Sequence, residues 1–488
     1  MPDFDLVVRN GTIATATDVM DCDIGIHDGT IVALAQDLGP ATKEIDAVGK
    51  LILPGGIDSH CHIDQLSALG IRNADDFESG TIAAAFGGTT TIIPFACQHH
   101  GDSLRAVVEE YHDRARPKAV IDYAFHLIVT DPSPEILGQE LPALIRDGYT
   151  SFKIYMTYDS LKLDDYQILD VLAVARREGA LVMVHAENYD MIRWLSDQLI
   201  DGGNRAPKFH AISHPRIAEG EATHRAISLA ELLDVPLLVV HVSTEEAMRE
   251  IRSAQVRGLK IYGETCPQYL LLTADDLDKP GMDGAMWCCS PPPRDAAAQA
   301  AIWQGIKGGV FQVLSSDHAP YRFDETGKLA KGPNVSFKEI ANGIPGIELR
   351  LPLLYSEGVG TGRIDVHQFV ALASTNAARL YGLYPRKGTI MVGSDADLAI
   401  WNTGKTQTIT YDMLHDRAGY TPYEGRSITG WPETVISRGR VVVDDGKLGV
   451  DIGSGEFLRC ASPESAKPLG RTLPELDPKR NFGATLSF

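Results

Sequence analysis

Short apolar runs alternate with amphipathic stretches from about residue 51 to residue 320. Each run has the length of a buried strand, and this alternation with helical stretches is typical of βα units around a parallel sheet. The predicted strands are residues 51–57, 89–95, 121–129, 151–155, 181–185, 237–241, 260–265 and 312–316. This strand number predicts an α/β fold, a closed (β/α)8 TIM-like barrel within residues 51–384, with its active site at the carboxyl ends of the strands.

Two of the intervening helices have clear signals. A helix is predicted to begin after Asp164 and to end at Gly179, because the apolar residues between them recur at helical spacing. These residues are Ile168, Leu169, Leu172 and Ala175. A second helix before the sixth strand is predicted by Ala222, Ala226, Leu229 and Leu233.

Both ends of the chain have a different pattern of apolar and polar residues. Residues 4–48 contain short β-rich pieces interrupted by Asn10-Gly11 and Asp28-Gly29, dipeptides that favour hairpin turns. Similar pieces return at residues 388–392, 396–401 and 434–443. We expect residues 1–50 and 385–460 to form one small β domain; the alternative is two unrelated hairpin regions. Residues 461–488 lack periodicity and predict an extended tail that lies on its own body or on a neighbour.

Composition narrows the classes of partner. The formal net charge of −20 and the sequence pI near 5.2 repel polyanions, so we expect neither nucleic acid nor an anionic membrane as a partner. Seven scattered cysteines do not form a disulfide framework and fit a reducing cytosol. The sequence has neither an apolar leader nor an uninterrupted apolar stretch of about 18 residues. These features predict a soluble, cytoplasmic protein.

Candidate metal ligands stand at the carboxyl ends of the predicted strands. His60 and His62 follow the first strand, and their i, i+2 spacing puts both on one face of an extended chain. The others are Lys153 on the fourth strand, His185 on the fifth, His241 on the sixth and Asp317 after the eighth. Any one of them could be a hydrogen-bonded interior histidine or a capping aspartate. Together, the imidazoles and the carboxylate predict a metal site.

A lysine among metal ligands needs an explanation, since an ammonium has no lone pair and repels a cation. One interpretation is that the buried amine of Lys153 becomes neutral and reacts with carbon dioxide. The resulting anionic carbamate has two oxygens that can bridge two metals. The alternative is that Lys153 is paired with an aspartate or a glutamate, and the residues by themselves leave both open.

The chain resembles the dihydropyrimidinase and D-hydantoinase family of the amidohydrolase superfamily. The motifs that carry the resemblance run nearly end to end: PGGIDSHCH at 54–62, FESGT at 77–81, FGGTT at 86–90, SFKIYMTY at 151–158, VHAEN at 184–188, ETCPQY at 264–269, SPPPR at 290–294, SSDH at 315–318 and NGIPG at 342–346. The resemblance implies a (β/α)8 barrel with a β-sandwich built from both chain ends. It also implies zinc-dependent hydrolytic ring opening of cyclic amides to N-carbamoyl amino acids, and a homotetramer.

The resemblance also assigns roles to individual residues. It implies two zinc ions bridged by carboxylated Lys153 and a hydroxide. His60, His62 and Asp317 would hold the more buried ion, and His185 and His241 the more exposed one. Asp317 would transfer the proton, and Tyr158 would donate to the developing oxyanion; otherwise Tyr158 is a packed aromatic at a strand end. Ser290 and Asn342 would hold the cyclic amide by main-chain groups.

Two departures from the family pattern bear on the substrate. Residues 64–70 differ from the aromatic-containing loop of many relatives, and Tyr155 stands where phenylalanine is common. We expect these positions to contact the substituent outside the ring. A hydantoin or a 5,6-dihydropyrimidine is the first candidate; a cyclic imide, allantoin, and a non-catalytic scaffold role are the alternatives. The remaining histidines are assigned to structure or surface: His99, His100, His112, His126, His210, His214, His224 and His318.

Overall fold

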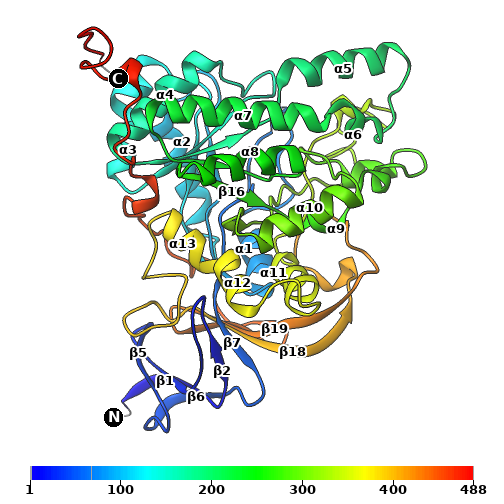
Figure 1. Ribbon diagram of the computed structural model, residues 1–488. Coiled ribbons are helices and arrows are strands. Elements are labelled where there is room, and N and C mark those ends of the chain that lie inside the picture. The colour runs from blue at the N-terminus through cyan, green and yellow to red at the C-terminus, as the bar shows by residue number, and fades with distance from the viewer. Residues whose placement is uncertain (1–2, 68, 487–488) are drawn as a thin grey trace.

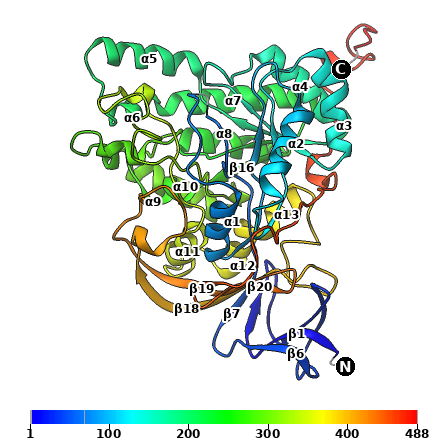
Figure 2. The same ribbon diagram turned by 180° about the vertical axis from the view of Figure 1, so that it is seen from behind.

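The computed structural model describes residues 3–67 and 69–486. It has a helix-covered parallel barrel and, below it in Figure 1, sheets formed from both ends of the chain. The predicted fold class is therefore confirmed. The view from behind in Figure 2 shows the same arrangement, with β1 and β6 farthest from the barrel helices. Within the described ranges, no helix has the length and apolar character needed to span a bilayer.

The barrel is built from two hydrogen-bonded groups of parallel strands. One has the order β10-β12-β13-β14-β15-β16-β17, and the other the order β11-β9-β8. Their bounds are β8 (Gly56–Asp58), β9 (Thr89–Ile92), β10 (Phe95–Cys97), β11 (Asp122–Tyr123), β12 (His126–Ile128), β13 (Ser151–Tyr155), β14 (Leu181–His185), β15 (Leu237–Val239), β16 (Ile261–Thr265) and β17 (Val313–Leu314). A parallel bridge between Cys61 and His318 joins the segments that follow β8 and β17 and closes the ring.

Helices cover the outside of this ring (Figure 1). They are α1 (Phe77–Phe86), α2 (Leu104–Ala115), α3 (Leu141–Arg146), α4 (Asp165–Glu178), α5 (Tyr189–Asp201), α6 (Phe209–Ser213), α7 (Arg216–Leu233), α8 (Glu245–Val256), α9 (Pro267–Leu271), α10 (Ala296–Lys307), α11 (Arg350–Leu354), α12 (Val366–Val370) and α13 (Asn376–Leu380). Helix α4 confirms its predicted ends. Asp164 caps it with a side-chain bond to the Gln167 N–H, and Gly179 ends it in the left-handed conformation.

The first predicted strand was wrong in one respect. Residues 51–57 form two strands, and the first of them, β7 (Leu51–Pro54), pairs with β18 and β2 in the terminal sheet. Only Gly56–Asp58 enters the barrel. An apolar run does not reveal which of two sheets buries it, because both environments favour the same residues. The second and third predicted strands are likewise interrupted, at residues 93–94 and 124–125.

The terminal sheets combine strands from both ends of the chain. One has the order β5-β4-β1-β6 and the other β21-β20-β19-β18-β7-β2-β3. Their bounds are β1 (Phe4–Arg9), β2 (Thr12–Ala14), β3 (Val19–Asp21), β4 (Asp23–His27), β5 (Thr30–Ala35), β6 (Ala41–Asp46), β18 (Leu398–Thr408), β19 (Ser427–Ser437), β20 (Arg440–Asp444) and β21 (Lys447–Leu448). The pairing of β7 with β18 excludes two unrelated hairpin regions.

One of the two predicted hairpin turns is confirmed. Asp28 and Gly29, both with positive φ, join β4 to β5 as an antiparallel pair. Asn10-Gly11 is not a hairpin turn, because β1 pairs with β4 and β6 whereas β2 pairs with β3 and β7. Asn10 has a positive φ as expected, but the chain passes there from one sheet to the other.

A buried ion cluster fastens the terminal sheet to the barrel. Lys387 Nζ lies 2.7 Å from Asp122 on β11 and 2.7 Å from Asp397, which precedes β18. Arg438, in the turn between β19 and β20, also contacts Asp122 at 3.0 Å. Removing one partner of such a cluster leaves an uncompensated buried charge, so these groups hold the two parts in a fixed relation.

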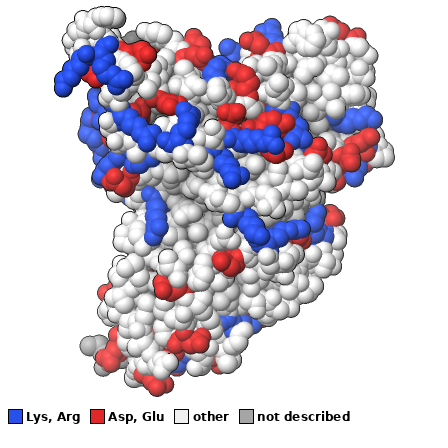
Figure 3. Space-filling view, in the orientation of Figure 1, with Lys and Arg blue, Asp and Glu red and all other residues white. Residues whose placement is uncertain are grey.

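The C-terminal tail lies on the body of the same chain. Lys260 donates to the carbonyl oxygens of Glu464 and Lys467, and the Arg471 N–H donates to Asp234. Figure 1 shows this segment in red beside α3 and α4. Figure 3 shows basic and acidic side chains interspersed over the upper part of one face, so opposite charges lie close together there.

Candidate metal centre and active site

The predicted site residues converge on one cavity of about 520 Å³. All of them line it except His60, which is fully buried beside it. The predicted residues in the cavity wall are His62, Lys153, Tyr158, His185, His241, Ser290, Asp317 and Asn342. They come from the carboxyl ends of different strands and from the segments that follow them, which the closed ring brings together.

His60, His62 and Asp317 form a group suited to a metal ion. One ligand atom from each lies within 4.8 Å of the others. Asp317 Oδ1 lies 3.1 Å from His60 Nε2 and 3.4 Å from His62 Nε2. Burial acts to raise the pKa of Asp317, but the two imidazoles hold it well below its usual range. Two imidazoles and an ionised carboxylate are the donor set that zinc prefers.

Lys153 is fully surrounded by protein and lies next to this group. Its Nζ is 2.9 Å from His60 Nε2, and it lies over the rings of Phe95 and Tyr155. In the described part of the chain, no carboxylate forms an ion pair with Lys153. The structure therefore does not contain the pairing with an aspartate or a glutamate that was the alternative to a carbamate. Burial lowers the pKa of Lys153 to about 8. About a tenth of the amine is therefore neutral at pH 7, far more than for an exposed lysine.

His185 and His241 form the other side of the cluster. Their ring centroids are 4.4 Å apart, and the rings of His241 and His60 are 5.3 Å apart. His185 Nε2 contacts Glu187 at 2.8 Å, which leaves Nδ1 for another partner. His241 Nδ1 is buried without a hydrogen-bond partner among the described residues. Two adjacent imidazoles, one with an orphaned nitrogen and one whose Nδ1 is not used by Glu187, fit a further metal ligand pair.

Backbone strain marks the same residues. Tyr158, His241 and Asp317 have φ values of 73°, 40° and 49°, a region that side-chain-bearing residues rarely adopt. Such conformations persist where the surrounding structure imposes them, and they concentrate at functional sites. Their coincidence with three predicted site residues supports the assignment of this cavity as the active site.

Tyr158, Ser290 and Asn342 also line the cavity. The hydroxyl of Tyr158 shares a hydrogen bond with the Ser290 side chain, and burial raises its pKa, so the phenol keeps its proton. Ser290 Oγ lies 3.3 Å from His210 Nε2. Asn342 Oδ1 is buried with no partner in the described chain. A protonated phenol and an unpaired amide oxygen at a cavity wall can hold a polar ligand.

Comparison with known proteins is consistent with this geometry. The profile of the Amidohydrolase family matches residues 51–442. The chain is 43% identical over 456 residues to a D-hydantoinase of Rhizobium radiobacter (93% of this chain, 98% of the relative). It is 44% identical over 458 residues to a D-hydantoinase of Geobacillus stearothermophilus (93% and 96%). The crystal structure of a dihydropyrimidinase from Brevibacillus agri superposes with a TM-score of 0.91 at 42% identity (94% and 99%).

The chain belongs to the D-hydantoinase and dihydropyrimidinase family of the amidohydrolases.

Glu264 contacts two of the predicted ligands in this hydantoinase-family chain, and it was not among the predicted site residues. Its Oε1 lies 2.6 Å from His60 Nδ1 and accepts the backbone N–H of His241 at 3.1 Å. The His60 Nδ1–H is therefore directed at a carboxylate, which leaves Nε2 for a metal. Glu264 stands in the seventh predicted strand, near its carboxyl end, so the signal that selected the other residues was present there too.

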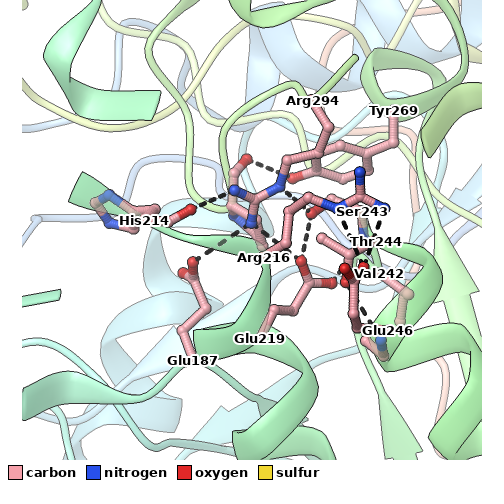
Figure 4. Close-up of polar contacts among 12 residues, drawn as sticks. Glu187, His214, Arg216, Glu219, Val242, Ser243, Thr244, Glu246, Tyr269 and Arg294 are labelled. Atoms are coloured by element: carbon pink, nitrogen blue, oxygen red, sulfur yellow. Dashed lines mark hydrogen bonds and ion pairs between the residues drawn. The ribbon is translucent and has the colours of Figure 1, made fainter. Parts of the chain in front are cut away.

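Glu187, which contacts His185, belongs with Arg294 to a second network that the sequence did not predict. Figure 4 shows Arg294 with Glu187, Glu219 and Ser243 around it. Arg294 lies 3.1 Å from Glu219 and 4.0 Å from Glu187 Oε1, and it donates to Ser243 Oγ at 3.0 Å. Burial acts to raise the pKa of Glu187, but the neighbouring histidines and Arg294 lower it to about 2. Glu187 is therefore ionised where it contacts His185.

The loop after the paired histidines lies in the wall of the cavity. Gln65 Oε1 accepts from His62 Nδ1 at 2.8 Å, and Gln65, Ser67 and Leu69 line the pocket together with Tyr155. Ala68 of this loop lies outside the described residues. His210 and His214, assigned to structure or surface from the sequence, also line the cavity. Neither histidine ends an apolar run, so the signal that selected the other residues was absent.

Proposed function

We propose that this chain is a metal-dependent hydrolase that opens cyclic amides, either hydantoins or 5,6-dihydropyrimidines, to N-carbamoyl amino acids. The observation that carries the proposal is the convergence of His60, His62 and Asp317 with Lys153 at one cavity. The relatives are named D-hydantoinases and a dihydropyrimidinase, and these names supply the class of substrate.

The proposed cofactor is a pair of zinc ions. His60, His62 and Asp317 would hold the more buried ion, and His185 and His241 the more exposed one. Carboxylated Lys153 and a hydroxide would bridge them. Carboxylation joins the neutral amine nitrogen of Lys153 to the carbon of CO2 and releases one proton, giving an anionic carbamate. The absence of an ion pair to Lys153 among the described residues and its lowered pKa both favour this reaction.

When bound, the metal pair would acidify water and polarise the amide carbonyl. Asp317 is placed to transfer the proton. Its contacts with His60 and His62 both use Oδ1, and the residue lines the cavity. It would take the proton from the hydroxide as it attacks and deliver it to the ring nitrogen as the C–N bond breaks. Its strongly depressed pKa keeps the carboxylate ionised, as a metal ligand has to be.

Tyr158 would donate its phenolic hydrogen to the oxygen that becomes negative during the attack. Burial keeps the phenol protonated, and its contact with Ser290 holds it at the wall. A donor fixed before the reaction stabilises the developing charge without reorganising. Ser290 and Asn342 would hold the ring amide by main-chain groups, while Tyr155 and the loop containing Gln65 face the substituent outside the ring.

A turnover panel tests the proposal. The purified, zinc-loaded enzyme is assayed with hydantoin, dihydrouracil, allantoin and succinimide, and the zinc content is measured by mass spectrometry. We expect hydantoin or dihydrouracil to be opened fastest, and the Asp317→Asn variant to be inactive. Faster turnover of succinimide or allantoin would mean that the substrate is a cyclic imide or allantoin, and not a hydantoin or a dihydropyrimidine. Failure of all four, with no stoichiometric zinc, would indicate a non-catalytic scaffold and end the proposal.

We extend the proposal to assembly and location. The β domain would comprise residues 1–50 and 385–460, the barrel residues 51–384, and the tail residues 461–488. A homotetramer would cover the apolar side chains that α5 to α7 expose, such as Trp194 at 63% and Ile217 at 64% exposure. Light scattering of the purified enzyme checks the assembly. The seven free thiols suit a reducing cytoplasm.

A further inference from the structure

Lys328 is a fully buried lysine outside both the catalytic cluster and the Lys387 ion cluster. Its Nζ donates to the carbonyl oxygens of Cys288 at 2.8 Å, Ala341 at 2.8 Å and Gly343 at 2.6 Å. An ammonium has three N–H donors, so these three carbonyls satisfy it completely. No carboxylate in the described ranges forms an ion pair with it. Lys328 is thus a cation held in a cage of main-chain oxygens.

Such a cage is costly to build. Lysine is almost never fully buried without a charged partner, and burial lowers the pKa of Lys328 to about 8. A methionine of similar length would fill the same space without desolvating a charge. A methionine could replace the packing of Lys328 but not its three hydrogen bonds. The residues whose carbonyl oxygens accept these bonds indicate what the ammonium does.

The three carbonyls belong to the two segments that carry the proposed ring-binding residues. Ala341 and Gly343 flank Asn342, and Cys288 stands two residues before Ser290. The Gly343 N–H also donates to the Cys288 carbonyl at 3.0 Å, so the two segments already touch. Ser290 and Asn342 line the cavity, whereas Lys328 lies behind them and acts only through them.

Few other contacts fix the position of Asn342. Its Oδ1 has no hydrogen-bond partner among the described residues, so that atom does not anchor the segment. Gly343 has φ of 143°, a conformation open to glycine, and an added Cβ would collide with the carbonyl oxygen of Ala319. The backbone here runs in a special conformation between the buried side chains of Ala341 and Ile344, while the Asn342 side-chain oxygen makes no hydrogen bond among the described residues. A central ammonium that binds the carbonyls on both sides of Asn342 would hold it in place.

We infer that Lys328 is the positioning residue of the ring-amide cradle, which ties the Ser290 and Asn342 segments together so that their main-chain groups meet the substrate. This inference rests on the proposed function, because the ligand of the cradle is the cyclic amide. It assigns no chemical step to Lys328.

The first test compares Lys328→Met with Lys331→Met. Lys331 is exposed in the same segment and serves as the matched control. We expect Lys328→Met to raise KM for hydantoin or dihydrouracil about tenfold or more, with kcat changed less and zinc content unchanged, as for loss of uniform binding. Lys331→Met should keep the wild-type KM. If Lys328→Met does not fold, Lys328→Gln against Lys331→Gln gives the same comparison. A folded Lys328 variant with the wild-type KM would overturn the inference.

The second test is chemical rescue. Lys328→Ala leaves a cage of three carbonyl oxygens that an ammonium ion can enter. We expect ammonium chloride to lower the raised KM of this variant, and tetramethylammonium chloride at equal ionic strength to leave it raised. Equal effects of the two salts would overturn the inference. A wild-type enzyme that opens no cyclic amide would refute the proposed function and this inference with it. An active wild type with an unaffected Lys328 variant would refute the inference alone.

Discussion

Lys153 and Lys328 show how neighbours decide what a buried amine does. All three donors of Lys328 are satisfied by carbonyl oxygens, so its ammonium is fixed and unreactive. Among the described residues, Lys153 has only the His60 imidazole at hydrogen-bond distance, and it lies over two aromatic rings. Lys153 also lines the cavity, whereas Lys328 does not, so a small molecule can reach its nitrogen. The same residue type is therefore structural at one position and open to covalent chemistry at the other.

Replacing Lys153 by alanine should remove metal and activity together. The change deletes the group proposed to bridge the two ions, and outer support from Glu264 and Glu187 cannot replace it. Zinc content by mass spectrometry and turnover should both fall, with partial rescue by small carboxylates such as formate. Lys331→Ala is the control. Two retained zinc ions with full activity would count against the carbamate.

Replacing Tyr158 by phenylalanine should reduce kcat by roughly 10², the usual scale for losing one oxyanion donor. The ring and its packing are kept, so zinc content and stability should not change. Tyr166→Phe, on the exposed surface of α4 at 75% exposure, is a matched control for the lost hydroxyl. An unchanged kcat would remove Tyr158 from the mechanism.

At the scale of elements, the ends of the strands carry the polar site residues, and the helices pack against the strands and hold them in position. Helix α4 illustrates the second role, because it buries Ile168, Val171 and Leu172 and follows the strand that carries Lys153. Its start is set by a capping box, in which Asp164 accepts from the Gln167 N–H and Gln167 reaches back to the Asp164 N–H. Local sequence fixes this boundary without help from the rest of the fold.

The Asp164→Ala change should therefore loosen only the start of α4. Loss of the cap costs about 1 kcal/mol, and we expect faster hydrogen exchange in the first turn with turnover unchanged. Asp170→Ala, inside the same helix, makes no such change and is the control. Wild-type exchange rates in the first turn of Asp164→Ala would show that tertiary packing, and not the cap, holds the helix end.

For the whole molecule, the terminal sheet and the barrel depend on each other. Ile13 and Ile24 from the N-terminal segment pack in one core cluster with Ile52, Leu398 and Ile436. The Lys387 ion cluster then joins this part to β11 of the barrel. The first strand segment of the chain middle, β7, is hydrogen-bonded to strands from both ends.

Deletion of residues 1–48 should make the chain insoluble. The deletion removes β2, one of the two partners of β7, and exposes the apolar face around Ile52 and Leu398 to water. The soluble fraction after expression measures this. Removal of residues 478–488 is the control, since the described part of that segment is mostly exposed and the protein should stay soluble. A soluble, active chain lacking residues 1–48 would show that this sheet is dispensable.

The sequence alone determined the fold class, the ends of α4 and the residues gathered at the cavity. These follow from local signals: period, caps, and polar residues that end apolar runs. His60, His62, Lys153, His185, His241 and Asp317 all carried that last signal. The resemblance added Tyr158, Ser290 and Asn342, and the cavity contains them too. Each of these features is encoded within a few residues of chain.

Only the tertiary structure decided which groups form hydrogen bonds to the predicted site residues and their segments, and which of the two sheets includes β7. Glu264 reaches His60 across 204 residues of sequence, and Lys328 reaches Cys288 across 40. The β7 run is apolar enough for either sheet, and its partner β18 lies more than 300 residues away. A hydrogen bond or a strand pairing depends on where two backbones meet in space. Local sequence determines the elements, whereas their contacts depend on how the whole chain closes.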